Sequence, residues 1–283
     1  MFFSGLQLAF EKSKPLLRPV LNPVWFGVNK AAAIPPLRKF FTDNFRSGLI
    51  ALGERNGTGI PWRWITVDVT GADLTQDFRF HPELPFQDST QRVVYSAHMI
   101  EHMDEPTILA VFREARRILK PGGYIRLEAP DAEKIIAAYL AGDEEFFRDF
   151  QRQNLDLHKN FGYPEAIGER HVAFIGVLSC YIEHGCHIPV IATRREVDEK
   201  VRALDLESFV NWCVTLQTPV QHASRGHVTA IYFAKLKRLL EEAGFETPRR
   251  MANRQTSIPN LSLRRIERTH RDFCSIFVEA RKP

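Results

Sequence analysis

Hydrophobic and polar positions in residues 92–131 follow two different periods, one after the other. A short apolar run at 93–95 predicts a strand, and apolar residues that recur every three or four positions across 108–119 predict an amphipathic helix. A second apolar run at 124–129 predicts another strand. The Lys-Pro-Gly-Gly sequence at 120–123 is expected to end the helix, because proline cannot continue it and glycine accepts a left-handed cap. The segment therefore predicts a βαβ unit of an α/β sheet.

Four polar residues follow the first of these strands: Ser96, His98, Glu101 and His102. Open α/β sheets bind ligands outside the carboxyl ends of their strands. We therefore expect these side chains to lie at a functional crevice. His98, Glu101 and His102 are the candidates for catalysis there, since imidazole and carboxylate groups exchange protons with substrates.

Two apolar runs upstream predict further strands of the same sheet. The run at 49–52 ends at Gly53, and the run at 64–67 ends at Asp68. Only ten residues follow Gly53 before the second run begins, which is too few for a full helix and two loops. We therefore expect a tight crossover between these strands, and a third, short strand within 72–78.

The strand pattern stops after residue 131, and helical patterns take its place. They cover 132–140, 144–154, 172–180 and 195–214. A block of this length is too long for a loop. We therefore expect a helical insertion that forms a lid over the crevice.

The predicted parts of the chain follow from these patterns. An N-terminal arm covers 1–48, an α/β core covers 49–131 and 226–283, and the insertion covers 132–225. The core ends with an amphipathic helix at 234–243 and an alternating stretch after it, at 272–280, which predicts a last, antiparallel strand.

Positive charge gathers at the two ends of a chain whose net charge is only +4. Residues 1–48 hold seven Lys or Arg against two acids, and residues 249–283 hold nine against three, so the middle is acidic. The basic ends suit an anionic membrane surface, an acidic partner or the acidic middle of the same chain. The arm is also rich in aromatic residues, which either dock it onto its own domain or make a peripheral membrane contact.

Other features of the composition bear on the compartment. No run of about 18 apolar residues predicts a membrane-spanning helix, and the N-terminus has neither the basic start nor the small-residue cleavage site of a secretory signal. The four cysteines form no paired Cys-x-x-Cys pattern, which favours free thiols in a reducing compartment. We expect a cytoplasmic protein, with membrane-peripheral attachment as the alternative.

Two motifs in this chain resemble the class I S-adenosylmethionine (SAM) dependent methyltransferases of the type 11 branch. One is the Arg-Ile-Leu-Lys-Pro-Gly-Gly run at 117–123, and the other is the Ile-Glu-His tripeptide at 100–102. The resemblance implies a Rossmann-like sheet, mostly parallel with the last strand antiparallel, and SAM as the cofactor. It also implies a small-molecule or glycan-type methyl acceptor held under the helical insertion.

The cofactor site that we expect begins at Gly53, where a glycine lets the backbone turn sharply near a ligand. The family usually has a second glycine two residues later, but Arg55 stands there, so Gly57 is expected to take its place and Arg55 to face the methionine carboxylate. Asp68 is expected to bind the ribose hydroxyls. The predicted cofactor-binding residues are Gly53, Glu54, Arg55, Gly57, Asp68, Asp77, Phe78 and Ser96. The resemblance places an acid near the adenine amino group, for which Asp77 beside Phe78 is preferred over Asp73.

Several other readings of the sequence stay open or are disfavoured. Loss of the second glycine also suits a methyltransferase-like binding or scaffold domain that no longer binds SAM. A nicotinamide-dependent oxidoreductase is disfavoured because no Gly-x-Gly-x-x-Gly motif follows a strand.

Cys180, Cys186 and His187 fit no compact zinc finger, so no metal is expected. Nucleic acid is not an expected partner, since the C-terminal arginines lack aromatic interleaving and no recognition module is visible. The oligomeric state is left open.

Overall fold

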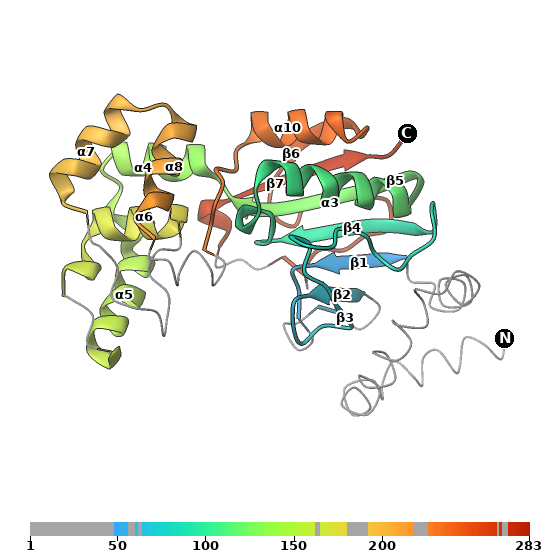
Figure 1. The fold of residues 1–283 in the computed structure, drawn as a ribbon, viewed down its shortest axis with the longest axis horizontal. Coiled ribbons are helices and arrows are strands. Elements are labelled where there is room, and N and C mark those ends of the chain that lie inside the picture. Colours follow the sequence, from blue (N-terminus) through green and yellow to red (C-terminus); the bar gives the residue numbers. More distant parts are fainter. Residues whose placement is uncertain are drawn as a thin grey trace.

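The computed structural model contains a seven-stranded sheet. It describes residues 48–55, 60–61, 64–161, 165–179, 192–217, 226–264, 266–267 and 271–283. The strands are β1 (Leu49–Leu52), β2 (Ile65–Asp68), β3 (Leu74–Thr75), β4 (Gln91–Ala97), β5 (Leu119–Pro130), β6 (Glu246–Met251) and β7 (Ser275–Arg281). Their order across the sheet is β3-β2-β1-β4-β5-β7-β6 (Figure 1).

The directions of the strands match the predicted sheet. β1 pairs in parallel with β2 and β4, β2 with β3, and β4 with β5. β7 runs antiparallel to both of its neighbours, β5 and β6. The prediction of a mostly parallel α/β sheet with an antiparallel last strand is therefore confirmed.

One face of the sheet is covered by two helices. Side chains alternate across a strand, so Ile50, Leu52 and Val94 point to the same face and pack in one buried cluster with α3 (Glu105–Ile118) and α10 (Phe233–Glu242). α3 begins at the N-cap Asp104, whose carboxylate accepts the Thr107 N–H at 3.0 Å. Figure 1 shows α3 and α10 side by side along the sheet.

The opposite face is covered by loops in the part of the chain that the structure describes. The alternate residues of the central strands, Leu49, Val93 and Tyr95 among them, form a second cluster with Trp64 and Ile266. This face also carries the polar side chains of β5, because Arg126 and Glu128 alternate with apolar residues that point to the helical face. The two faces therefore differ in chemistry as well as in cover.

The glycine turn at 120–123 follows the end of the helix, as predicted, but it also belongs to a strand. α3 ends at Ile118 with Leu119 as its C-cap, and β5 starts at the same Leu119. Register slips between Gln91 and Val93, which leaves the glycines in an irregular stretch of β5. Gly122 has φ +76° there, and its N–H donates to the Lys282 carbonyl at 2.9 Å. The glycines thus bend a strand and join it to the C-terminal residues.

The helices of the insertion follow β5 without a linker, since Asp131 caps the first of them. They are α4 (Ala132–Leu140), α5 (Glu144–Phe161), α6 (Arg170–Ser179), α7 (Arg194–Ala203) and α8 (Leu206–Thr215). The predicted helix at 195–214 is therefore two helices. The break falls at Asp205, which caps α8 by accepting the Ser208 N–H at 3.0 Å.

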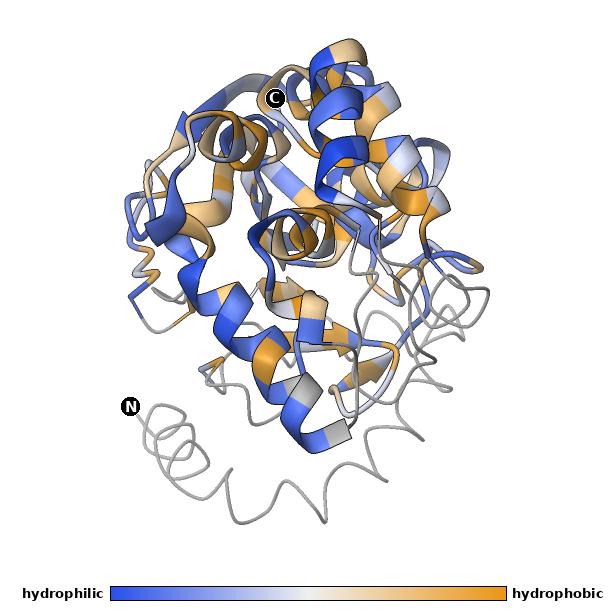
Figure 2. Ribbon diagram, turned by 90° about the vertical axis from the view of Figure 1, so that its left-hand side faces the viewer, coloured by the Kyte–Doolittle hydropathy of each residue, from blue (hydrophilic) through white to orange (hydrophobic). Residues whose placement is uncertain are grey.

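The insertion has a hydrophobic cluster of its own. Tyr139, Phe174 and Phe209 stack at its centre, with ring centroids 4.1 and 5.4 Å apart along the series. Figure 2 shows hydrophilic and hydrophobic residues on the same helices, as expected for helices that bury one side each. Figure 1 places these helices beyond the carboxyl end of β5.

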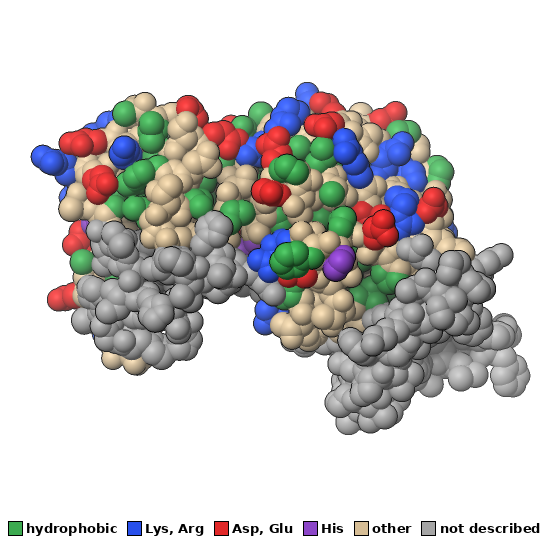
Figure 3. Space-filling view, viewed as in Figure 1, with side chains coloured by type: hydrophobic (Ala, Val, Ile, Leu, Met, Phe, Trp, Pro, Cys, Tyr) green, Lys and Arg blue, Asp and Glu red, His purple; other side chains and the backbone are tan. Residues whose placement is uncertain are grey.

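None of the helices in the described residues is long and apolar enough to cross a membrane. Acidic and basic side chains are interspersed on the face that carries α3 and α10 (Figure 3). Of the C-terminal arginines, Arg250 pairs with Asp131 and Glu133 of the same chain. The predicted arm and the Cys180 and Cys186 thiols lie outside the described residues.

Candidate active site

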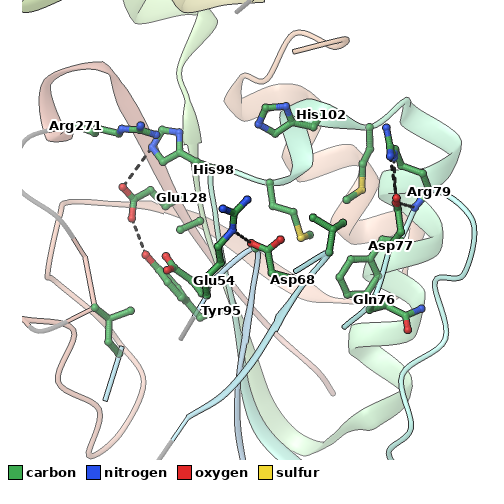
Figure 4. A pocket seen from close by; sticks show the side chains of 18 residues that line it. Glu54, Asp68, Gln76, Asp77, Arg79, Tyr95, His98, His102, Glu128 and Arg271 are labelled. Atoms are coloured by element: carbon green, nitrogen blue, oxygen red, sulfur yellow. Dashed lines mark hydrogen bonds and ion pairs between the residues drawn. The ribbon is translucent and has the colours of Figure 1, made fainter. Parts of the chain in front are cut away.

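A cavity of about 520 Å³ opens at the carboxyl ends of β1, β2 and β4. This is the edge at which open α/β sheets bind their ligands, and the volume is that of a small-molecule site. Its lining consists of Gly53, Glu54, Arg55, Asp68, Val69, Gln76, Asp77, Phe78, Arg79, Tyr95, Ala97, His98, Met99, His102, Met103, Glu128, Ile266 and Arg271 (Figure 4).

The first loop of the site turns at Gly53. This residue has φ +74°, and its N–H donates to the Val67 carbonyl at 2.8 Å. A Cβ placed on it would lie 2.7 Å from the Cβ of Met99. Only glycine fits here, because of the backbone conformation and because the Met99 loop packs directly against it. Glu54 follows, and its side chain is buried on the cavity wall.

Asp68 and Arg55 form an ion pair across the mouth of this loop. The Arg55 Nε lies 3.4 Å from Asp68 Oδ2, and the two side chains are 57% and 13% exposed. The structure thus places both predicted residues on the cavity, with Arg55 against Asp68 (Figure 4). Gly57, which was expected to replace the missing second glycine, lies outside the described residues.

The two acids that compete for the adenine position have different surroundings. Asp77 lines the cavity with Phe78, and its carboxylate accepts two hydrogen bonds from the Arg79 guanidinium, at 3.0 and 2.8 Å, and one from the Arg79 backbone N–H. Asp73 is buried and bonds to the backbone and hydroxyl of Thr66. It holds the β2–β3 connection and does not line the cavity.

His98 stands at the end of β4 in a left-handed conformation, with φ +46°. Its Nδ1 lies 3.2 Å from Glu101 Oε1, and its Nε2 lies 3.1 Å from Ser275 Oγ and 3.5 Å from Glu128 Oε1. Burial lowers the pKa of His98, but its bonds to Glu101 and Glu128 outweigh this and leave the pKa above its ordinary value. His98 therefore bridges the two carboxylates.

Glu101 and His102 lie on a short 3₁₀ helix (Ile100–His102) after β4 and point to different places. Glu101 is 1% exposed and is not among the cavity lining. Burial raises its pKa, but the hydrogen bond and charge of His98 prevail and hold the pKa at about 2. His102 lines the cavity, and its ring meets that of His227 edge to face, with centroids 4.8 Å apart.

Ser96, a predicted cofactor contact, does not line the cavity. It alternates with Tyr95 and Ala97, so its side chain points to the helical face of the sheet and is buried there. Its position at the end of β4 does not reveal to which face of the sheet its side chain points. Glu101, a candidate for catalysis, does not line the cavity either, and the roles of both residues stay predictions.

Several cavity residues were missed at the level of sequence. The Tyr95 hydroxyl donates to Glu128 Oε2 at 2.7 Å on the cavity wall. The pKa of Tyr95 is raised well above its ordinary value, first by burial and then by the charge of Glu128. Glu128 was recognisable as an acid near the carboxyl end of a predicted strand. Arg271 was not, since it reaches the cavity from a loop more than 140 residues later in the chain.

Comparison with known proteins adds the family of this domain. A family model described as a methyltransferase domain matches residues 56–127. No curated protein matches the sequence.

Solved structures resemble the chain at low identity. The apo SAM-dependent methyltransferase SibL is 13% identical with a TM-score of 0.35, over 83% of this chain and 42% of that one. A possible histamine N-methyltransferase from Thermotoga maritima is 16% identical with a TM-score of 0.39, over 97% and 98%. A SAM-dependent methyltransferase from Methanosarcina mazei is 12% identical with a TM-score of 0.39, over 83% and 91%. This chain thus spans less than half the length of SibL.

The donor groups of the cavity fit the cofactor of such a domain. Asp68 is a hydrogen-bond acceptor for vicinal hydroxyls at the tip of the second strand, the position that binds ribose in dinucleotide folds. Glu54 adds a buried carboxylate beside the glycine turn, where a cationic ligand group is favoured. The family match at residues 56–127 and the order of the sheet support a class I SAM-dependent methyltransferase domain, whose cofactor is SAM.

Proposed function

We propose that the chain transfers a methyl group from SAM to a small-molecule or glycan-type acceptor that enters beside the helical insertion. The observation that carries this proposal is the cavity itself. It joins a glycine turn and a ribose-type acid at one side to a histidine-lined wall at the other, between the carboxyl ends of adjacent strands. Two ligands in one cavity are what a group transfer requires.

The donor side is formed by the first two strands. Asp68 accepts hydrogen bonds from the ribose hydroxyls, and Asp77 with Phe78 receives the adenine. For this, Arg55 leaves Asp68 and turns to the methionine carboxylate. The exposed Arg55–Asp68 pair contributes at most about 1 kcal/mol, so the exchange is inexpensive.

The acceptor side is formed by the segment after β4. SAM supplies a methyl group already activated on a sulfonium, so the chain mainly aligns the acceptor with it. His98 contacts Glu101 and Glu128 and fixes the start of this segment as a positioning residue. His102 faces the cavity and contacts the nucleophilic atom of the acceptor, from which it takes the proton when that atom is a hydroxyl oxygen or an amine nitrogen.

The insertion is proposed to select the acceptor. Its first helix, α4, starts one residue after β5 ends, so the insertion begins at the cavity edge of the sheet. The polar lining, which includes Tyr95, Glu128 and Gln76, suits an acceptor that carries several hydroxyl groups.

Transfer of a labelled methyl group tests this function. The full chain is incubated with methyl-labelled SAM and a panel of hydroxylated small molecules and oligosaccharides. We expect label on at least one acceptor, and at least a tenfold lower rate for His102→Gln. The matched control is His81→Gln, which removes an exposed imidazole outside the cavity and should keep the full rate. Label on no member of the panel, in protein that binds the cofactor product S-adenosylhomocysteine (SAH), would contradict the acceptor class.

A second function is favoured by one specific contact. The Arg55–Asp68 pair occupies the acid that should bind ribose, as a scaffold domain that has lost SAM would allow. This reading predicts a folded chain that takes up neither SAM nor SAH. Retained SAH binding would eliminate it.

A further inference from the structure

A second, small cavity lies behind the wall that His102 forms. Its volume is about 10 Å³, and it is lined by Glu101, Pro130, Ala132, His227 and neighbouring residues of the insertion. This is roughly the space of one water molecule or one ion. Glu101 and His227 border the small cavity and His102 borders the large one, so this cluster of three side chains separates the two.

The three side chains converge although they come from distant parts of the sequence. One ligand-type atom each of Glu101, His102 and His227 lies within 4.8 Å of the other two, and His227 Nε2 is 3.9 Å from Glu101 Oε1. The Val228 N–H donates to the Glu101 carbonyl at 2.8 Å, which holds the segment before α10 against the 3₁₀ helix. Ligands of a tetrahedral zinc ion lie roughly 3.4 Å apart. Small side-chain rotations would therefore bring these atoms to coordinating positions.

One atom of the cluster lacks a partner. Glu101 Oε2 is buried and has no hydrogen bond to any residue that the structure describes, while Oε1 is bonded to His98. A buried acceptor left without a partner costs about 1–3 kcal/mol, and more when it is charged. Such an atom beside a cavity of ionic size points to a bound ligand.

The neighbours of the cluster orient it as metal ligands are usually oriented. The ring of His227 is hydrogen-bonded to the backbone of Leu178, and Glu101 is hydrogen-bonded to His98. Hydrogen bonds from the far side of an imidazole or carboxylate set the direction in which it presents its ligand atom.

We propose that Glu101, His102 and His227 bind a divalent transition-metal ion, with zinc as the best match. Two imidazoles and one carboxylate form a known zinc ligand set that leaves a position open. Because His102 lines the large cavity, that position faces the acceptor side. With an ion bound, His102 would be a ligand and no longer a base. The ion would lower the pKa of an acceptor hydroxyl, whose proton would then leave to solvent. This last role rests on the proposed function, whereas metal binding does not.

Calorimetry with Zn²⁺ alone tests the site in the full chain, purified without a histidine tag. We expect one ion per chain with micromolar or tighter affinity, and at least tenfold weaker binding in Glu101→Gln and in His227→Gln. His81→Gln, which removes an exposed imidazole outside the cluster, should leave the affinity unchanged. No Zn²⁺ binding at a Zn²⁺ concentration 100-fold above the expected micromolar dissociation constant would overturn the proposal. Equal Zn²⁺ affinity in Glu101→Gln and the unchanged chain would also overturn it.

A spectroscopic measurement keeps the proposal testable if a variant fails to fold. Co²⁺ added to the unchanged chain should give visible bands of nitrogen and oxygen ligation, and Cys186→Ser should not alter them. An intense thiolate band that disappears in Cys186→Ser would assign the ion to the cysteines and reject the cluster. SAH binding, measured on the same samples, separates failure of the metal site from failure of the methyltransferase function.

Discussion

Two buried carboxylate clusters in this molecule differ in how completely their atoms are paired. In the first, the fully buried Arg126 donates to Glu267, to Glu279 and to the Ala252 carbonyl. Glu279 also accepts from Thr256 and Ser257, and Glu267 from the backbone of Arg254. In the second, Glu101 keeps one oxygen without a partner among the described residues. The carboxylates Glu101, Glu267 and Glu279 are all almost fully buried, so exposure does not account for the difference.

The difference indicates two kinds of role. A buried charge is tolerated when every lone pair and every proton is satisfied, and such a closed network orders the chain around it. Arg126 ties β5 to β7 and to the loops that cover this face of the sheet. A cluster with an unsatisfied atom next to a cavity is poised to bind something else. The Arg126 cluster is therefore structural, and the Glu101 cluster is suited to a ligand.

Truncating Arg126 should have the largest effect. Arg126→Met leaves Glu267 and Glu279 buried without their cation, which we expect to lower the free energy of unfolding by about 3–5 kcal/mol. Urea denaturation monitored by circular dichroism measures it. Arg113→Met removes an exposed pair with Glu242 and should cost less than about 1 kcal/mol. Equal losses in the two variants would remove the distinction between closed network and surface pair.

The pH dependence of stability should report on Glu267. Burial raises its pKa to about 7, although Arg126 opposes this. The folded chain therefore binds the proton more tightly than the unfolded chain, and this contribution to stability is complete below pH 4.5 and is lost as the pH rises to about 7. Between pH 5 and 8 we expect the free energy of unfolding of the unchanged chain to fall by about 2–3 kcal/mol relative to that of Glu267→Gln. A constant difference between the two across this range would show that Glu267 does not titrate there.

Two matched amide substitutions compare the clusters directly. Glu279→Gln disturbs a carboxylate with donors on both oxygens, and we expect it to cost about 2–3 kcal/mol. Glu101→Gln changes a carboxylate with one oxygen that has no hydrogen-bond partner among the described residues. It should lower the free energy of unfolding by about 1–2 kcal/mol in metal-free protein. Denaturation of both variants at neutral pH gives the comparison. A larger loss for Glu101→Gln would mean that the second cluster is also a structural network.

Arg55 should have the smallest effect. If it moves from Asp68 to the methionine carboxylate, Arg55→Ala weakens SAH binding by about three- to tenfold and leaves stability within about 0.5 kcal/mol. Calorimetry and denaturation measure the two quantities. Tighter SAH binding in this variant would show instead that Arg55 competes with the ribose for Asp68.

The sequence predicted the strands of the sheet better than the side chains of the site. β1, β2 and β4 were recognisable because buried parallel strands are continuous apolar runs, and Gly53 and Asp68 stand where those runs end. Ser96 was misplaced because position along a continuous run does not reveal which face a residue takes. Only the pairing of the strands settles that.

Contacts made over long separations could not be predicted in this way. His227 lies directly after the insertion and Arg271 lies just before β7, so each reaches its cavity only through contacts between segments distant in the sequence. The Lys-Pro-Gly-Gly turn ends α3 as predicted, but its inclusion in β5 depends on pairing that the local pattern does not show. In each case tertiary pairing decided between readings that the local pattern left equal.

The sheet edge between Gly53 and Asp68 is the site at which SAM is expected to bind. Titration of SAH into the full chain and into Asp68→Ala, followed by calorimetry, tests it directly. We predict one site in the micromolar range, weakened roughly 10- to 100-fold by Asp68→Ala, as expected for the loss of hydrogen bonds to a charged acceptor. Absence of binding by the unchanged chain at millimolar SAH, or equal affinity in the variant, would contradict the claim.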